Sequence, residues 1–217
     1  MAQLKKVNRK SIWLKIDGIK NLFVTFHESD KLKGLFSINS VCLMKCPFKA
    51  FCYAERYLSI RPSVRNAYDK NHECLSKKLE ILPIFPIGSL VRFFSFGDIN
   101  NGVYARNMRA IAEKNPSSVF GVWIREITYP FMKNQKTDNM TFIYSNKVVD
   151  SPKTPSEIPF FVNHTFNVCT KGNIEEIKRK LETQGEKVFI CGAKSCATCK
   201  HCYTLNNERS TILEILK

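Results

Sequence analysis

Residues 90–124 read LVRFFSFGDINNGVYARNMRAIAEKNPSSVFGVWI and contain one complete strand–helix–strand unit. The apolar runs at 90–96 and 119–124 have the length and composition of buried strands. Between them, residues 102–114 have helical periodicity, and Asn115-Pro116 ends the helix. Two strands joined through a helix predict a parallel pair with a βαβ crossover.

The same alternation continues on both sides of this unit. Strands are predicted at 140–144, 158–162 and 188–190, with an amphipathic helix at 173–184. This alternation of strands and helices predicts an α/β fold, either a partial (βα) barrel or an open parallel sheet. Upstream, residues 54–82 carry helical signals, with Pro62 starting a second helix, and residues 11–16 and 21–26 form a β-hairpin around Asp17-Gly18.

We therefore expect a single compact domain with three parts. Residues 1–35 form the N-terminal hairpin extension, and residues 36–190 form the α/β core with the first group of cysteines. Residues 191–217 hold a C-terminal Cys-rich metal loop and a helix. No apolar run is long enough to cross a bilayer, so we expect no membrane partner.

Each predicted strand ends in polar or charged residues. The carboxyl ends of parallel strands line the active face of such folds, so these side chains are expected to converge. Asp98 and His164 are the candidate catalytic residues, although Asp98 could instead cap the following helix and His164 could be a hydrogen-bonded structural residue. The strand-end candidates are Ser95, Gly97, Asp98, Arg125, Glu126, Ser145, Asn146, Asn163 and His164.

Seven of the nine cysteines fall into two groups. Closely spaced thiolates can converge on a soft metal, and the alternative is a disulfide framework. The N-terminus, MAQLKKVNRK, lacks the apolar core of a secretory signal, so we expect a cytoplasmic protein whose clustered cysteines bind metal. The first group is Cys42, Cys46 and Cys52, and the second is Cys191, Cys196, Cys199 and Cys202.

The second group has the spacing C-x4-C-x2-C-x2-C. Consecutive two-residue gaps are typical of ferredoxin-type iron–sulfur ligation, so this spacing favours a 4Fe–4S cluster. Zinc held by four cysteines is the alternative. His201 and Cys169 are two further residues that could replace a ligand of this site.

The first group has the spacing C-x3-C-x5-C, with Phe51 and Tyr53 on either side of Cys52. Three ligands leave one iron of a 4Fe–4S cluster open. In this respect the chain is similar to the radical-SAM enzymes, whose usual pattern is C-x3-C-x2-C with an aromatic residue beside the third cysteine. The resemblance implies that the open iron binds S-adenosylmethionine and that residues 94–98, FSFGD, replace the Gly-Gly-Glu that binds its amino group.

A closer resemblance depends on the order of four motifs. They are Cys52-Tyr53-Ala54, then RPSVRNAY at 61–68, FSFGD at 94–98 and ICGAKSCATCKHCY at 190–203. Together they resemble the phage "gene product eighty-eight" domain family over residues 36–205. The resemblance implies a phage or mobile-element protein acting in the host cytoplasm, and it supports the two cysteine sites.

The net charge of +15 is the most unusual bulk property. It favours a polyanionic partner, with nucleic acid first, although a solvated basic surface is the alternative. Two functions follow. The first is an iron–sulfur enzyme of radical-SAM-like type that modifies nucleic acid, and the second is a non-enzymatic zinc or iron–sulfur module that binds nucleic acid. The sequence leaves the oligomeric state open.

Overall fold

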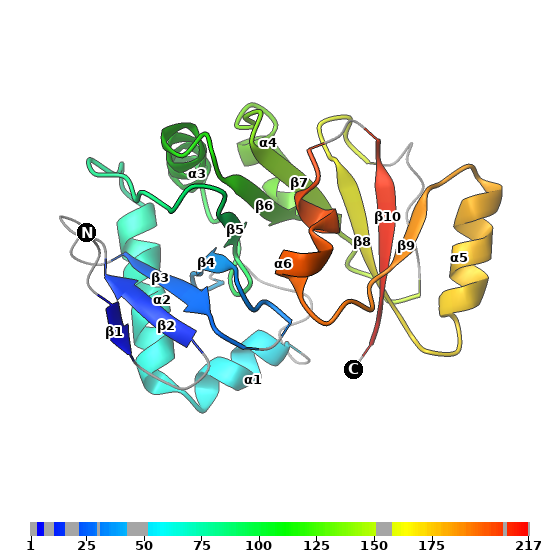
Figure 1. Ribbon diagram of the computed structural model, residues 1–217, viewed down its shortest axis with the longest axis horizontal. Helices are drawn as coiled ribbons and strands as arrows, with labels where there is room; N and C mark the ends of the chain where they lie inside the picture. Colours follow the sequence, from blue (N-terminus) through cyan, green and yellow to red (C-terminus); the bar gives the residue numbers. More distant parts are fainter. Residues whose placement is uncertain are drawn as a thin grey trace.

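A computed structural model describes residues 4–6, 11–15, 22–29, 31–42, 52–150, 158–205 and 208–216. These residues form a ten-stranded sheet in the order β1-β2-β3-β4-β5-β6-β7-β8-β10-β9 (Figure 1). The strands are β1 Leu4–Lys6, β2 Ser11–Lys15, β3 Phe23–His27, β4 Phe36–Ile38, β5 Leu90–Phe93, β6 Val119–Ile124, β7 Met140–Ser145, β8 His164–Cys169, β9 Val188–Ile190 and β10 Ser210–Ile215. The helices are α1 Tyr53–Ser59, α2 Pro62–Leu75, α3 Gly102–Lys114, α4 Tyr129–Met132, α5 Ile174–Thr183 and α6 Cys196–Cys199, with short 3-10 helices η2 Glu126–Thr128 and η4 His201–Tyr203.

The sheet has an antiparallel part and a parallel part. Strands β1 to β4 pair antiparallel, and strands β4 to β10 pair parallel. The predicted α/β class with an open parallel sheet and an N-terminal hairpin is therefore confirmed. The predicted hairpin turn at Asp17-Gly18 lies outside the described residues.

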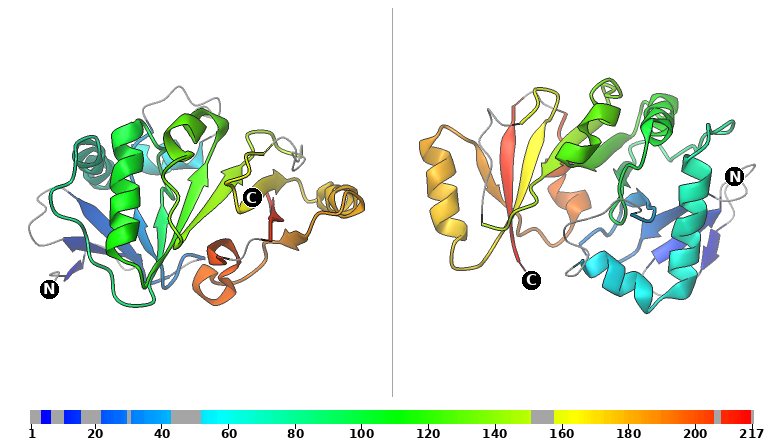
Figure 2. Two further views of the ribbon diagram at one scale, coloured as in Figure 1. Left: turned by 90° about the horizontal axis from the view of Figure 1, so that it is seen from above. Right: turned by 180° about the vertical axis from the view of Figure 1, so that it is seen from behind.

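The main hydrophobic core lies between one face of the sheet and helices α2, α3 and α4. Alternate residues of the central strands point into it, including Val91, Phe93, Phe120 and Val122, which are all fully buried. Figure 2 shows α2 and α3 on this face and α6 on the opposite, concave face. Helix α5 packs against β9 and β10 through a smaller cluster that contains Leu181 and Leu213.

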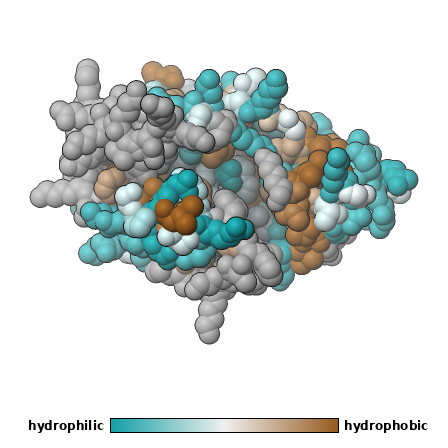
Figure 3. All heavy atoms as spheres, turned by 90° about the horizontal axis from the view of Figure 1, so that it is seen from below, coloured by the Kyte–Doolittle hydropathy of each residue, from teal (hydrophilic) through white to brown (hydrophobic). Residues whose placement is uncertain are grey.

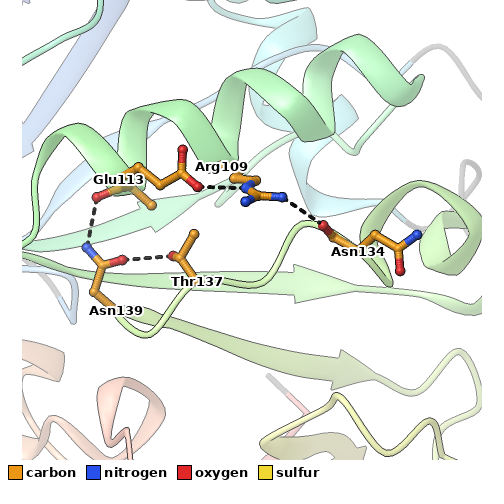
Figure 4. A network of polar contacts seen from close by, with 6 residues as sticks. Arg109, Glu113, Asn134, Thr137 and Asn139 are labelled. Carbon is orange, nitrogen blue, oxygen red and sulfur yellow. Dashed lines mark hydrogen bonds and ion pairs between the residues drawn. The ribbon is translucent and has the colours of Figure 1, made fainter.

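Polar contacts fix the turn between α3 and β6 to the start of β7 (Figure 4). The amide nitrogen of Asn139 donates to the carbonyl oxygens of Ala112, Asn115 and Ser118 at 2.9, 3.0 and 3.0 Å. Two carbonyls at the end of α3, those of Ala112 and Asn115, thereby gain a hydrogen-bond donor. On the helix surface, Arg109 pairs with Glu113 at 2.7 Å.

The predicted strand at 158–162 is wrong. These residues form turns, and strand β8 begins only at His164. The apolar run contains Pro159, which cannot donate a ladder hydrogen bond, and Ile158 and Val162 instead fill the core from the turn. The C-terminal segment, for which a helix was expected, contains the four-residue helix α6 and ends in β10, which inserts between β8 and β9.

The concave face of the sheet carries residues in two rows. Ser37, Arg92, Gly121 and Thr141 are paired in register across β4, β5, β6 and β7. Trp123, Ile143, His164 and Ser210 are paired in the same way across β6, β7, β8 and β10. Because side chains alternate along a strand, each row projects to one side of the sheet, and Gly121 and Trp123 place both rows on the same face.

The surface differs between the two ends of the molecule. Figure 3 shows a band of hydrophobic surface on the side that carries β8, β9 and β10, while much of the remaining coloured surface is hydrophilic. At the end of β10, Ile215 and Leu216 are exposed. No helix in the described part of the chain is both long and apolar enough to span a membrane.

Candidate functional sites

The first cysteine segment leaves the sheet at the carboxyl end of β4, the first parallel strand. Cys42 is exposed and Cys52, which directly precedes α1, is partly buried. Cys46 lies outside the described residues. After Cys52, α1 packs Leu58 against Val41, so the segment begins and ends on a common hydrophobic cluster.

The loop after β5 runs directly against this segment. The Ser40 amide donates to the carbonyl of Phe96 at 3.2 Å, and the side chain of Asn39 accepts from the Phe96 amide at 3.1 Å. Gly97 has φ +90°, and a Cβ atom there would lie 2.6 Å from the carbonyl carbon of Ser40 and overlap its oxygen. Only glycine allows the two backbones to approach this closely.

Asp98 follows Gly97 and is buried. Burial raises the pKa of its carboxyl group above the usual value, while the hydrogen bond from the Ile99 amide and the charge of Arg125 act in the opposite direction. Asp98 does not cap α3. The side chain of Asn101 accepts from the amides of Val103 and Tyr104 at 2.9 and 3.0 Å and is the N-cap.

The other strand-end candidates belong to the loops that follow β6 and β7. Arg125 precedes η2, and the Thr128 hydroxyl accepts from its backbone amide at 3.0 Å. Glu126 pairs with Lys147 at 3.1 Å. Ser145 ends β7, and the Asn146 side chain accepts from the Val148 amide at 3.1 Å. These residues lie at the same carboxyl edge as Asp98, as predicted from the strand order.

A buried polar network supports the start of the first cysteine segment. The hydroxyls of Ser40 and Tyr104 are 2.8 Å apart, and Tyr104 contacts Nδ1 of His72 at 2.5 Å. Asn100 donates to the carbonyl of Val41 at 3.3 Å. Burial lowers the pKa of His72 and raises that of Tyr104. The sequence alone does not reveal this network, because its residues come from separate elements.

The second cysteine segment lies on the concave face of the sheet. The Cys191 amide donates to the Leu213 carbonyl at 2.7 Å, and the Cys196 amide donates to Lys31 at 2.8 Å. The hydroxyl of Thr141 donates to the carbonyl of Cys202 at 2.8 Å. The segment therefore joins the ends of β9 and β10 to the middle of the sheet and to the turn before β4.

Packing holds the end of this segment against β6. Tyr203 is buried, and its Cε1 atom would lie 2.8 Å from a Cβ atom at Gly121. Its ring meets Trp123 edge to face at 6.4 Å. The Arg92 guanidinium stacks 3.7 Å from the centre of the Trp123 ring. A glycine in the row therefore creates the space that Tyr203 fills.

The four thiols of the second segment share one electrostatic environment. Burial, with a smaller contribution from the neighbouring Cys191, Cys196 and Cys199, raises the pKa of Cys202 to about 12, against the lowering effect of Arg92. Burial likewise raises the pKa of Cys196, while Arg92 and Lys31 lower it. Lys31 forms an ion pair with Glu214.

His164 is the first residue of β8 and does not follow a strand, which corrects the prediction that it ends one. Its Nδ1 lies 2.8 Å from the Ser210 hydroxyl, and Nε2 of His201 lies 2.9 Å from the same oxygen. Burial and, to a smaller extent, the charge of His201 together lower the pKa of His164 to about 4. These contacts agree with the structural alternative and place His164 beside the second cysteine segment.

Cys169 lies elsewhere. It is fully buried in the cluster with Ile174 and Leu213 beneath α5, and burial raises its pKa to about 11. This environment is that of a core thiol. His201 stacks on Phe189 with ring centroids 4.3 Å apart, so its ring also serves packing.

The described residues include no group of three or more His, Cys, Asp or Glu side chains close enough to hold a metal ion as they stand. A metal would have to draw the sulfur atoms of the second segment together. The donor set fits such a group, because four thiols on one short segment interact with one another beside the cations Arg92 and Lys31. Comparisons with family models, curated proteins and solved structures found no match to this chain.

Proposed function

We propose that this chain is an iron–sulfur protein of radical-SAM-like type. Cys42, Cys46 and Cys52 would hold a 4Fe–4S cluster with an open iron, and the four C-terminal cysteines would hold a second centre. One observation carries the proposal. The first cysteine segment follows the first parallel strand at its carboxyl end, and the residues that lead into it, Asn39 and Ser40, are hydrogen-bonded to the loop after the second parallel strand.

The chain's own residues would have distinct tasks at this edge. Gly97 allows the loop after β5, which carries Ser95 and Asp98, to lie against Ser40 at the start of the first cysteine segment. The buried Asp98 carboxyl is suited to an ammonium group, because a cation beside it would favour its ionised form. When bound, the cluster would supply the electron that cleaves S-adenosylmethionine. Ser95, Gly97 and Asp98 are the residues we assign to cofactor binding, with Ser145 and Asn146 further along the same edge.

Nucleic acid is the substrate class that the charge supports. A net charge of +15 attracts a polyanion, and affinity for random DNA and RNA should fall steeply as salt rises. Binding that does not change with salt would contradict this substrate. The resemblance to the phage domain family supports a role in a phage or mobile element, in the host cytoplasm.

A non-enzymatic module is the second candidate function. The observation that favours it is the second cysteine segment, because four thiolates fill the coordination sphere of zinc and need no open position. In that case zinc or iron–sulfur would serve folding, and the basic surface would bind nucleic acid without chemistry.

The test is the iron, sulfide and zinc content of protein purified without oxygen, together with its absorption spectrum before and after dithionite. We expect iron with matching sulfide and a visible band that bleaches. The variant Cys46→Ala should lose one cluster and keep the other. Cys74→Ala is the matched control, since Cys74 lies outside both groups and is partly buried. Stoichiometric zinc without a visible band would support the module, and unchanged metal in Cys46→Ala would contradict the first site.

A further inference from the structure

Three buried hydrogen-bond donors lie together beneath the C-terminal cysteines. They are Arg92 Nε, Trp123 Nε1 and Tyr203 Oη, and each lacks a hydrogen-bond partner among the described residues. Arg92 stacks on Trp123, and Trp123 meets Tyr203 edge to face. A buried donor without an acceptor costs about 1–3 kcal/mol. Three such donors, on side chains that pack in sequence from Arg92 to Trp123 to Tyr203, indicate that this place receives an acceptor.

The sulfur atoms of the second segment are the acceptors at hand. Cys202 directly precedes Tyr203, and the charge of Arg92 acts on both Cys196 and Cys202. A neutral thiol is only a weak acceptor. A thiolate bound to a metal carries negative charge and accepts charge-assisted hydrogen bonds, so metal binding would supply what the three donors lack.

The net charge of a metal site formed by the four cysteines also indicates a role for Arg92. Four thiolates bring more negative charge than zinc or an oxidised 4Fe–4S core neutralises, and a buried net charge needs a cation beside it. Lys31 divides its charge between Glu214, in an ion pair, and the thiol of Cys191, so it compensates only part of this charge. Arg92 lies in the middle of β5, and its guanidinium contact is with the neutral Trp123 ring. Its charge is therefore available to the cysteines.

We propose that Arg92, Trp123 and Tyr203 donate hydrogen bonds to the metal-bound thiolates of Cys196 and Cys202. The guanidinium of Arg92 also compensates the negative charge of these thiolates. The proposal rests on the proposed function only in that the C-terminal cysteines bind a metal. It applies to zinc as well as to an iron–sulfur cluster. The three side chains are positioning residues, because they would contact the cysteine ligands and would not coordinate the metal themselves.

The test uses the full chain with Cys46→Ala, so that the C-terminal site is read alone, and compares Arg92→Gln, Arg92→Lys and Tyr203→Phe. The readout is the rate at which a chelator removes the metal. We expect Arg92→Gln to lose metal about 10- to 100-fold faster, as is typical when a residue supporting a metal ligand is removed. Arg92→Lys should recover most of the retention, since it keeps the charge. If the metal is an iron–sulfur cluster, its reduction potential should also fall in Arg92→Gln, because the reduced form is more negative.

Arg106→Gln is the matched control. Arg106 is exposed on α3, on the other side of the sheet, so the variant removes the same charge without touching the site. Equal metal retention in Arg92→Gln and Arg106→Gln would overturn the proposal. If Arg92→Gln does not fold, Tyr203→Phe decides, since it removes only a hydroxyl. Unchanged metal retention in Tyr203→Phe would overturn the proposed hydrogen bonds to the thiolates, and faster metal loss would support them. Zinc without iron and sulfide in the parent protein would instead overturn the proposed iron–sulfur function. The rates of zinc loss from Arg92→Gln and Arg106→Gln would then still test the role of Arg92.

Discussion

The two cysteine segments have similar sequence signals but are supported in different ways. The first lies at the carboxyl edge of the sheet. There, the Ser40 amide donates to the Phe96 carbonyl and the Asn39 side chain accepts from the Phe96 amide, which holds the start of the segment beside the loop after β5. The second lies across the concave face, where Tyr203 packs against Gly121 and Trp123. The first site should therefore be most sensitive to backbone conformation, and the second to side-chain volume and charge.

Gly97→Ala should have the largest effect, and it should act on the first segment. The new Cβ would overlap the Ser40 carbonyl in a backbone conformation, φ +90°, that alanine rarely adopts. We expect the free energy of unfolding to fall by more than about 3 kcal/mol, because strain and overlap add. Urea unfolding checks the stability, and metal analysis should show loss from the first site.

Gly88→Ala separates the two causes of this loss, which are the backbone strain at positive φ and the overlap with Ser40. Gly88 has a similar φ of +77°, but nothing lies within 4 Å of the Cβ position. This variant should cost only the conformational strain, about 1–2 kcal/mol. Equal losses in the two variants would show that the close approach of Gly97 to Ser40 does not support the first segment.

The next effect concerns pH and the residues beneath the second segment. The pKa of His164 is lowered by burial from 6.5 to about 4, so the folded protein holds this ring neutral. The stabilisation is complete above pH 6.5 and is lost as the pH falls toward 4, because only the unfolded chain takes up the proton. The shift corresponds to a loss of about 3 kcal/mol across this range.

The comparison between wild type and His164→Gln isolates this contribution. Both proteins share the titration of their carboxylates, so the difference in their free energies of unfolding, measured by urea titration from pH 7 to pH 4, should shrink as the pH falls. A constant difference would mean that His164 does not titrate in this range and that its contacts with Ser210 and His201 act independently of pH.

The regular parts of the fold could be predicted from the sequence, because local patterns determine them. Strong apolar runs and the Asn115-Pro116 stop placed α3 and β6 within their observed bounds. Strand β8 was missed because most of its buried positions carry polar side chains, His164, Thr165 and Asn167, while the preceding apolar run, which contains Pro159, has the composition expected of a strand. The position of β10 between β8 and β9 depends on pairing between distant segments, which no local pattern encodes.

The candidate sites show the same division. The cysteine groups and the polar carboxyl edge were visible from spacing alone. The partners that give the sites their properties were not visible. Tyr104 contacts Ser40, and His72 contacts Tyr104, only through the packing of α2 and α3. In the sequence, Arg92 is simply one charge within an apolar strand. Sheet register places Arg92 beside Gly121 and therefore under Tyr203.

Of the three substitutions Gly97→Ala, His164→Gln and Gly121→Ala, the last should have the smallest effect on stability. It should also affect the second metal site, whereas Gly97→Ala affects the first. The added methyl group would meet Tyr203 at 2.8 Å and Trp123 at 3.1 Å, which is overpacking without backbone strain, and we expect a loss of about 1–3 kcal/mol. Because the displaced side chain follows Cys202, metal should be lost from the second site and kept at the first. Gly172→Ala is the control, since nothing lies within 4 Å of its Cβ position. Metal loss from the first site in Gly121→Ala would mean that the two segments form one coupled centre, and the distinction between an edge site and a packed site would fail.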